Sequence, residues 1–128
     1  YEAGAITYMR TDGVQMDMSA ILAARDAIAE RFSPDYRPEK PRFYSTKAKN
    51  AQEAHEAIRP TDFSRRPGRS DSDAERLYAL IWNRTVASQM ASARLERTTV
   101  ELFDDEGRHG LKATGQVVIT PGFLALYT

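Results

Sequence analysis

The stretch TTVELFDDEG, residues 98–107, decides the fold class of this chain. Its first six positions alternate side to side with the period of an extended strand, and the DDEG that follows has the composition of a turn. Beyond it, residues 111–114 and 116–120 again favour strands, and Pro121-Gly122 indicates a second turn. The last third of the chain therefore predicts antiparallel strands, the final one being an apolar strand over 123–127.

Upstream of that stretch the sequence predicts helices. Apolar residues recur at helical spacing over 21–32, Ser19 is a candidate N-cap, and the helix is expected to end before Pro34. A short helix is predicted over 50–58 and the longest one over roughly 73–90. Helices followed by antiparallel strands give an α+β fold.

The longest predicted helix has capping candidates in Asp71-Ser72-Asp73. This run feeds directly into a helix and is therefore interpreted as a cap. The apolar stripe of the helix is predicted to contain Leu77, Leu80, Ile81, Ala87 and Met90. The large aromatic residues are assigned to packing: Phe32, Tyr78, Trp82 and Phe123.

The composition limits the possible functions. At 128 residues the chain is long enough for one domain with a modest core, and its 18 basic residues balance its 18 acidic ones. The balance is uneven, because residues 37–69 hold nine Lys/Arg against four Asp/Glu, which points to a local anionic partner. There is no cysteine, so disulfides and thiolate metal sites are excluded. No apolar run reaches membrane-spanning length, and no signal peptide is visible.

The residues that suggest chemistry lie in ITYMRTD, residues 6–12. Side chains at i and i+2 of a strand point to the same face, so Tyr8 and Arg10 can reach the same small object. A phenol is a poor nucleophile at neutral pH, but a neighbouring guanidinium favours its ionised form and can bind two phosphate oxygens. The pair therefore suits attack by a tyrosine on a phosphodiester. The ordinary alternative is a core tyrosine with a solvated arginine nearby.

Three stretches support the first interpretation. GAITYMRTD at 4–12 resembles the active-site segment of bacterial type IA DNA topoisomerases. QEAHEAIRPT at 52–61 is similar to a second segment of that family, and LYALIW at 77–82 followed by ASQM at 87–90 is similar to a third. They occur in family order and at family-like spacing, so the resemblance covers the whole chain. One departure is Gly13, where the family usually has Ser and a local hydroxyl.

The resemblance implies roles for individual residues. Tyr8 would attack a backbone phosphate of single-stranded DNA, giving a 5′-phosphotyrosine link and a free 3′-hydroxyl. Arg10 would stabilise the charge that grows on the phosphate oxygens. The residues implied to contact DNA or to orient these two are His55, Arg59, Thr7 and Asp12.

Two of these assignments leave alternatives open. His55 and Arg59 lie at i and i+4 of the predicted short helix, on one face. For His55 the alternative is a capping or packed histidine, and for Arg59 it is an internal salt bridge. The stretch begins like a zinc-binding helix, but its second histidine position is occupied by Arg59, so no zinc site is predicted.

The resemblance also implies an organisation. Residues 1–96 would form the tyrosine-bearing gate domain, mainly helical and winged-helix-like, and residues 97–128 part of the arch domain. The chain would be a fragment of a longer enzyme and inactive alone, because Mg²⁺ is bound in a separate domain outside it. We expect ATP-independent relaxation of negatively supercoiled DNA in the cytoplasm, at the nucleoid. The alternatives are a noncatalytic winged-helix-like DNA-binding module and a purely structural or protein-interaction domain.

Overall fold

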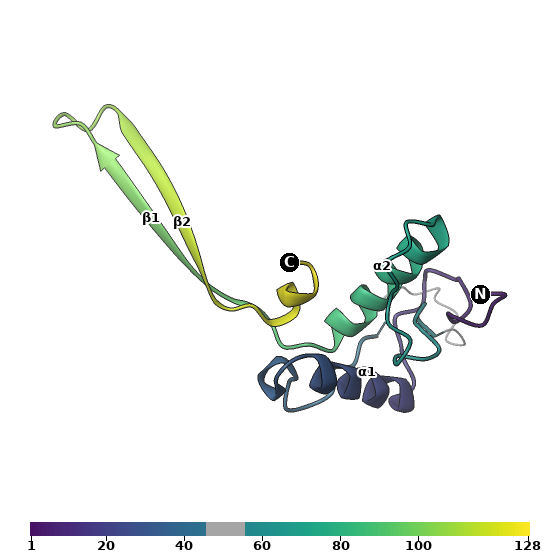
Figure 1. The fold of residues 1–128 in the computed structure, drawn as a ribbon. Helices are drawn as coiled ribbons and strands as arrows, with labels where there is room; N and C mark the ends of the chain where they lie inside the picture. The colour runs from purple at the N-terminus through teal and green to yellow at the C-terminus, as the bar shows by residue number, and fades with distance from the viewer. Residues whose placement is uncertain (46–55) are drawn as a thin grey trace.

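The computed structural model describes residues 1–45 and 56–128. These residues form a helical body from which a long antiparallel hairpin projects (Figure 1). The elements in chain order are α1 (Met18–Arg31), the 3₁₀ helix η1 (Pro34–Tyr36), α2 (Asp73–Ser88), β1 (Arg94–Phe103), β2 (Gly110–Thr120) and the 3₁₀ helix η2 (Gly122–Leu126). The predicted α+β class is confirmed.

The core lies where α1 and α2 pack together, with residues from the loop before α2 and from η2 completing it. Its centre is Trp82, which is 1% exposed and donates its indole N–H to the carbonyl of Phe63 at 3.3 Å. The predicted packing role of Trp82 is therefore confirmed. The buried apolar cluster consists of Ala20, Ala24, Ile28, Phe63, Tyr78, Trp82, Val86, Ala87, Met90 and Leu126.

The helix starts follow from local hydrogen bonds. The N-cap of α1 is Asp17 and not the predicted Ser19, because the carboxylate of Asp17 accepts the backbone N–H of Ser19 at 3.0 Å. The helix ends at Arg31, before Pro34, as predicted. Ser72 caps α2 by accepting the backbone N–H of Glu75 at 3.3 Å, which confirms a capping role within residues 71–73.

The predicted apolar stripe of α2 is wrong in its first turns. Tyr78 and Trp82 point into the core, whereas Leu77 and Leu80 are 55% and 64% exposed. Apolar side chains occur on two faces of this helix, and the packing against α1 selects the aromatic one. The predicted members that do enter the core are Ala87 and Met90.

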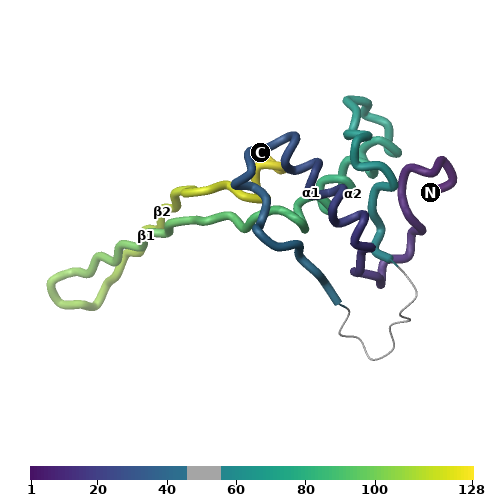
Figure 2. The backbone as a smooth tube through the Cα atoms, turned by 90° about the horizontal axis from the view of Figure 1, so that it is seen from below, coloured from purple at the N-terminus to yellow at the C-terminus, as the bar shows by residue number. Residues whose placement is uncertain are grey.

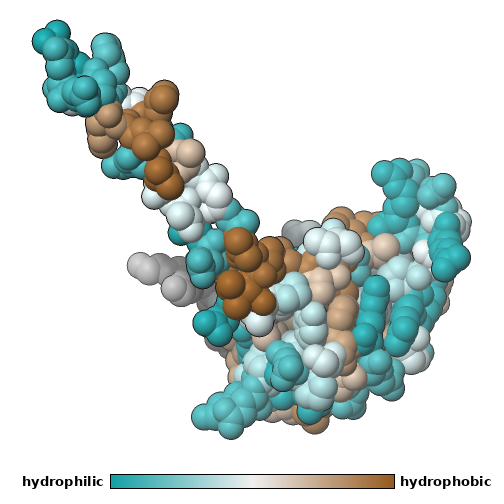
Figure 3. Space-filling view, turned by 60° about the vertical axis from the view of Figure 1, so that its left-hand side comes forward, coloured by the Kyte–Doolittle hydropathy of each residue, from teal (hydrophilic) through white to brown (hydrophobic). Residues whose placement is uncertain are grey.

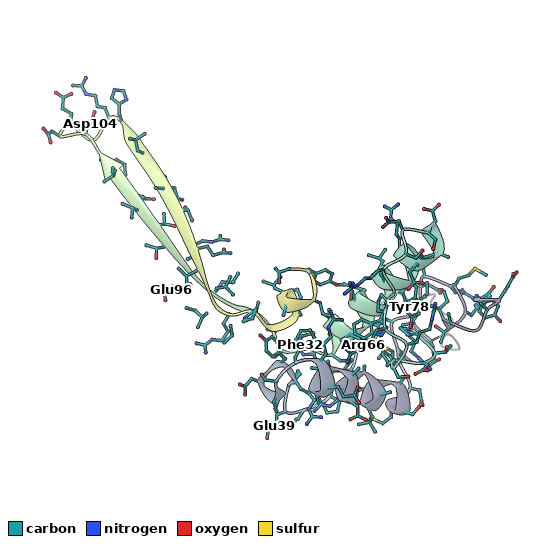
Figure 4. All side chains as sticks on the ribbon, viewed as in Figure 1. Phe32, Glu39, Arg66, Tyr78, Glu96 and Asp104 are labelled. Atoms are coloured by element: carbon teal, nitrogen blue, oxygen red, sulfur yellow. The ribbon has the colours of Figure 1, made fainter. Side chains whose placement is uncertain are left out.

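Tyr78 also joins α2 to the arginine-rich loop that precedes it. The hydroxyl of Tyr78, which is labelled in Figure 4, donates to the carbonyl of Arg65 at 2.5 Å. The guanidinium of Arg65 lies 4.1 Å from the centre of the tyrosine ring. Burial raises the pKa of Tyr78, with the nearby Arg65 acting in the opposite direction. This tyrosine is a packing residue with a bonded hydroxyl.

The hairpin of β1 and β2 confirms the predicted strands and turn. The strands pair in antiparallel register from Arg94 opposite Thr120 to Phe103 opposite Gly110, and the N–H of Gly107 closes the turn on the carbonyl of Asp104 at 3.0 Å. Every residue of both strands is exposed. Apolar patches follow the arm of the hairpin toward its polar tip (Figure 3).

The predicted strand over 123–127 is wrong, because residues 123–126 belong to η2 and Tyr127 is its C-cap. Gly122 has a φ of +51°, and a Cβ there would lie 2.5 Å from the carbonyl oxygen of Ala91. The N–H of Phe123 then donates to that same carbonyl at 2.9 Å. This close approach turns the chain back to the helical body, where Leu126 enters the core.

The predicted helix over 50–58 is also corrected where the structure describes it. Residues 56–60 are not helical, and Glu56 and Pro60 each form an isolated β-bridge. Arg59 therefore does not lie on a helix face. His55 and the rest of 46–55 lie outside the described residues.

Candidate active site

The segment around Tyr8 is held by the second family-like stretch, which lies about fifty positions along the chain. Ile6 forms an antiparallel bridge with Pro60. Around it, the N–H of Thr7 donates to the carbonyl of Arg59 at 2.9 Å, and the N–H of Thr61 donates to the carbonyl of Ala5 at 3.0 Å. The N-terminal segment and the chain after the undescribed residues thus run side by side (Figure 2).

The Thr7 side chain adds to this pairing. Its hydroxyl donates to the carbonyl of Ala57 at 2.8 Å and accepts the N–H of Arg59 at 2.9 Å. One side chain therefore satisfies two backbone groups of the facing segment. The hydroxyl of Thr61 donates a hydrogen bond to the carbonyl of Gly4, which links the same two segments. Together these bonds fix the backbone on both sides of Ile6 and directly before Tyr8.

Tyr8 follows this fixed backbone and points outward. Its side chain is 54% exposed, so it is not the ordinary core tyrosine that the sequence left open. Its ring meets the ring of Tyr1 edge to face, with centroids 5.5 Å apart and an interplanar angle of 74°. An exposed phenol on a hydrogen-bonded segment is accessible to a large substrate.

Arg10 and Asp12 lie together on the same segment. The Nε of Arg10 is 2.8 Å from a carboxylate oxygen of Asp12, and both side chains are partly exposed. A contact through Nε fixes the plane of a guanidinium, since the group is rigid and planar. The geometry therefore places Asp12 where it can orient Arg10.

Arg59 makes internal contacts. Its Nη2 lies 3.2 and 3.1 Å from the two carboxylate oxygens of Glu56, and its Nη1 donates to the carbonyl of Pro60 at 3.1 Å. Only 15% of this side chain is exposed. Of the two roles left open for Arg59, the structure contains the internal salt bridge. Its buried Nε finds no acceptor among the described residues.

Glu56 connects this arginine to α1. One of its carboxylate oxygens accepts the N–H of Asp17, the N-cap of α1, at 3.1 Å. The N–H of Ala57 also donates to the carbonyl of Gln15 at 2.8 Å. Sequence reasoning did not assign Glu56 a role, although it lies inside the second family-like stretch and three residues before Arg59.

Gln89 is a second residue whose role sequence reasoning missed. It is 1% exposed, and its amide group both accepts the N–H of Arg42 at 3.2 Å and donates to the carbonyl of Arg42 at 2.9 Å. Both the oxygen and the nitrogen of this buried amide are hydrogen-bonded, so Gln89 fixes the backbone at Arg42. The only signal in the sequence was its place in the third family-like stretch.

The described residues do not fit a magnesium site. They contain no group of three or more His, Asp or Glu side chains arranged to hold a metal ion. Within the Asp71-Ser72-Asp73 run, Ser72 caps α2 and Asp73 lies 3.7 Å from Arg76. In the part of the chain that the structure describes, no helix has the length and apolar character needed to cross a membrane.

Comparison with known proteins gives consistent matches. The chain is 66% identical over 127 residues to DNA topoisomerase 1 of Zymomonas mobilis, covering 99% of this chain and 10% of that protein. It is 48% identical to DNA topoisomerase 1 of Xylella fastidiosa, with 97% of this chain and 16% of that protein covered. The chain thus spans a small part of the length of these relatives.

The fold is matched as well. The solved full-length topoisomerase I from Thermotoga maritima aligns with a TM-score of 0.78 and 34% identity, covering 96% of this chain and 19% of that one. The family described as DNA topoisomerase matches residues 1–128. Because that match includes every residue, this chain belongs to the bacterial DNA topoisomerase family.

Proposed function

We propose that this chain carries the tyrosine nucleophile of a type IA DNA topoisomerase and acts as part of a longer polypeptide. The intact enzyme would cleave one DNA strand transiently, pass a strand through the gap and reseal it, thereby relaxing negative supercoils. Its substrates are single-stranded and negatively supercoiled DNA. The observation that carries the proposal is the exposed Tyr8 on a segment fixed by hydrogen bonds to residues 57–61.

The covalent step balances without an external energy source. The phenol oxygen of Tyr8 forms a bond to phosphorus while the bond from phosphorus to the 3′ oxygen breaks. The phenol releases its proton, and the departing 3′ oxygen takes one up. Resealing is the reverse, attack by the 3′-hydroxyl on the phosphotyrosine ester. Since the ester conserves the phosphodiester bond energy, ATP is not needed.

The neighbours of Tyr8 have supporting roles in this proposal. Arg10 stabilises the negative charge on the nonbridging oxygens as phosphorus becomes five-coordinate. Asp12 holds Arg10 through the 2.8 Å contact, and Thr7 fixes the backbone before the nucleophile. His55 would contact DNA near the scissile phosphate, and Arg59 would contribute mainly by holding the segment through Glu56.

Other parts of the longer polypeptide would supply what this chain does not. Mg²⁺ would be bound by a separate acidic domain, because the described residues here do not fit it. That domain is the main protein partner of this chain, which alone would be inactive. We place the enzyme in the cytoplasm, at the nucleoid.

The alternative, a noncatalytic winged-helix-like DNA-binding module, needs Tyr8 in a core and a hairpin packed beside the helices. Here Tyr8 is 54% exposed. The hairpin points away from the helical body (Figure 1). Neither requirement of the alternative is met, which favours the catalytic proposal.

The test uses the full-length protein with end-labelled single-stranded DNA. Tyr8→Phe should abolish covalent attachment of the label while DNA binding remains within about threefold of wild type. Tyr1→Phe is the matched control, because it removes a hydroxyl from the ring that contacts Tyr8, and it should leave attachment unchanged. Attachment that persists in Tyr8→Phe would place the nucleophile elsewhere. The 128-residue chain alone should leave supercoiled DNA unrelaxed.

A further inference from the structure

A groove of about 710 Å³ opens beside the segment that follows the tyrosine motif. One wall is formed by residues of the 11–16 stretch, which continues directly from Tyr8 and Arg10. A second wall includes residues 42–44, and residues between 84 and 89 at the end of α2 also line the groove. The remaining lining residues are Ile21, Ala57, Ile58 and Phe123. Nothing in the roles assigned above uses this groove.

The groove contains exposed aromatic rings. Phe43 is 64% exposed and Tyr44 is 45% exposed, and both line it. A ring as large as phenylalanine is usually buried in a folded protein, so two adjacent exposed rings need an explanation. Flat aromatic faces at the surface of a groove are suited to stacking against another flat group.

The charge of the groove has one sign. Arg42 and Arg84 line it, whereas no Asp or Glu is found among its described lining residues. Neither arginine pairs with a carboxylate within the described ranges 1–45 and 56–128. In a chain with equal numbers of acidic and basic residues, this local excess favours an anionic ligand.

The aromatic wall is held rigidly. The buried amide of Gln89 binds the backbone of Arg42 on both sides, at 2.9 and 3.2 Å. The hydroxyl of Tyr44 donates to the carbonyl of Ser88 at 2.8 Å, and Nη2 of Arg42 donates to the hydroxyl of Ser92 at 3.1 Å. These bonds fix the wall to the end of α2, so binding there would require little ordering of the protein.

We propose that this groove binds a nucleotide of the single DNA strand that flanks the phosphate attacked by Tyr8. A base stacks on Phe43 or Tyr44, and Arg42 and Arg84 bind the adjacent phosphates. Stacking platforms combined with arginines are how proteins hold single strands without reading their sequence. The inference rests on the proposed function for the identity of the ligand, and on the continuity of the 11–16 wall with the tyrosine motif for its position.

The experiment uses the full-length protein and single-stranded oligonucleotides carrying one 5-iodouracil at successive positions. Irradiation should crosslink Phe43 or Tyr44 from one or two neighbouring nucleotide positions, mapped by mass spectrometry. Phe43→Ala should raise the Kd for the oligonucleotide about tenfold, which is within the range expected for the loss of one stacking contact. The matched control is Phe103→Ala, which removes the same ring from β1 on the distant hairpin and should leave the Kd unchanged.

Covalent attachment at Tyr8 is measured on the same oligonucleotides, so the two proposals fail separately. One outcome would refute DNA binding in the groove and leave the nucleophile proposal standing. It is attachment at Tyr8 with no crosslink at residues 43–44 and with equal Kd values for Phe43→Ala and Phe103→Ala. Crosslinks at 43–44 without attachment at Tyr8 would support the groove and refute the nucleophile. A groove already filled by another part of the polypeptide would also give no crosslink, and would overturn the inference.

Discussion

At the scale of single residues, the arrangement around Tyr8 depends on how its arginine neighbour is held. Arg10 contacts Asp12 through Nε at 2.8 Å, so the two groups are paired on one short segment. A guanidinium held in this way keeps its orientation before the substrate arrives, and pre-placed charges are what stabilise a transition state most effectively. The pair therefore lends itself to testing as a unit.

We expect Arg10→Ala in the full-length enzyme to slow covalent attachment of DNA by about a hundredfold, the usual cost of losing one such donor. Arg10→Lys should recover only part of that loss, because the lysine keeps the charge but not the planar fork. The rate is measured by trapping labelled DNA on the protein at successive times. Equal rates for wild type and Arg10→Ala would contradict the role assigned to this arginine.

The companion variant is Asp12→Asn, which removes the charge that holds Arg10 and keeps the shape. If Asp12 acts through Arg10, it should slow attachment in the wild-type background and have no further effect in Arg10→Ala. Independent, multiplying effects of the two substitutions would show that Asp12 has a separate function.

At the scale of the elements, the end of α2 fixes the segment that leads toward His55. We expect Gln89→Leu to lower the free energy of unfolding by about 2 kcal/mol, since it leaves the N–H and the carbonyl of Arg42 without their partner. Gln116→Leu is the matched control, because that glutamine is exposed on β2, and it should change stability by less than about 0.5 kcal/mol. Urea unfolding followed by the fluorescence of Trp82 measures both.

Asp17, the N-cap of α1, should make the free energy of unfolding depend on pH. Hydrogen bonds from the hydroxyl and N–H of Ser19 lower the pKa of Asp17 from its ordinary value of 3.8. Because the folded pKa is below the unfolded one, the contribution is fully present above about pH 5 and is lost as pH falls through the folded pKa. Asp17→Asn keeps the capping oxygen without a titrating group.

The measurement compares unfolding of wild type and Asp17→Asn at pH 7 and near pH 3. The stability difference between the two proteins should shrink at the lower pH. A difference that stays constant would mean that the charge of Asp17 contributes nothing to the cap.

Local patterns in the sequence predicted where the helices and strands lie. They predicted less well which face of each helix is buried. The alternation over 98–103 and the proline at position 34 act on neighbouring residues, so the strand and the end of α1 could be predicted. Leu80 of α2 was assigned to the core because it is apolar, yet α1 packs against the opposite, aromatic face. That choice depends on a partner helix about fifty residues away, which no local pattern contains.

The candidate site shows the same division. The spacing of Tyr8 and an arginine two positions away was visible in the sequence, whereas the bonds of Thr7 to residues 57 and 59 are tertiary. The return of Leu126 to the core depends on the close contact between Gly122 and Ala91. A Pro-Gly pair before an apolar run indicates a turn but not what the run will pack against.

At the scale of the whole molecule, the hairpin is separated from the core. It carries apolar side chains on a two-stranded ribbon with every position exposed, among them Leu111 at 73%. Figure 4 shows Glu96 near its base and Asp104 at its tip, well away from the helices. A two-stranded hairpin without a covering layer is marginally stable in water. The chain spans only 10% of its Zymomonas mobilis relative. In the longer polypeptide that we propose, other parts would cover the hairpin.

This separation predicts two levels of stability in one chain. In the 128-residue chain alone, backbone amides of β1 and β2 should exchange with solvent far faster than those of α1 and α2 near Ile28 and Val86, which are fully buried. In the full-length protein the hairpin amides should become protected, because covering strands or domains would bury the apolar ribbon and occupy its free edges. Hydrogen exchange read by mass spectrometry compares the two forms peptide by peptide, with the α1 peptide as internal reference. If the hairpin amides of the short chain were as protected as those of α1 at every protein concentration, the ribbon would be stable by itself. If protection appeared only at high concentration, a second copy of the chain would be covering it.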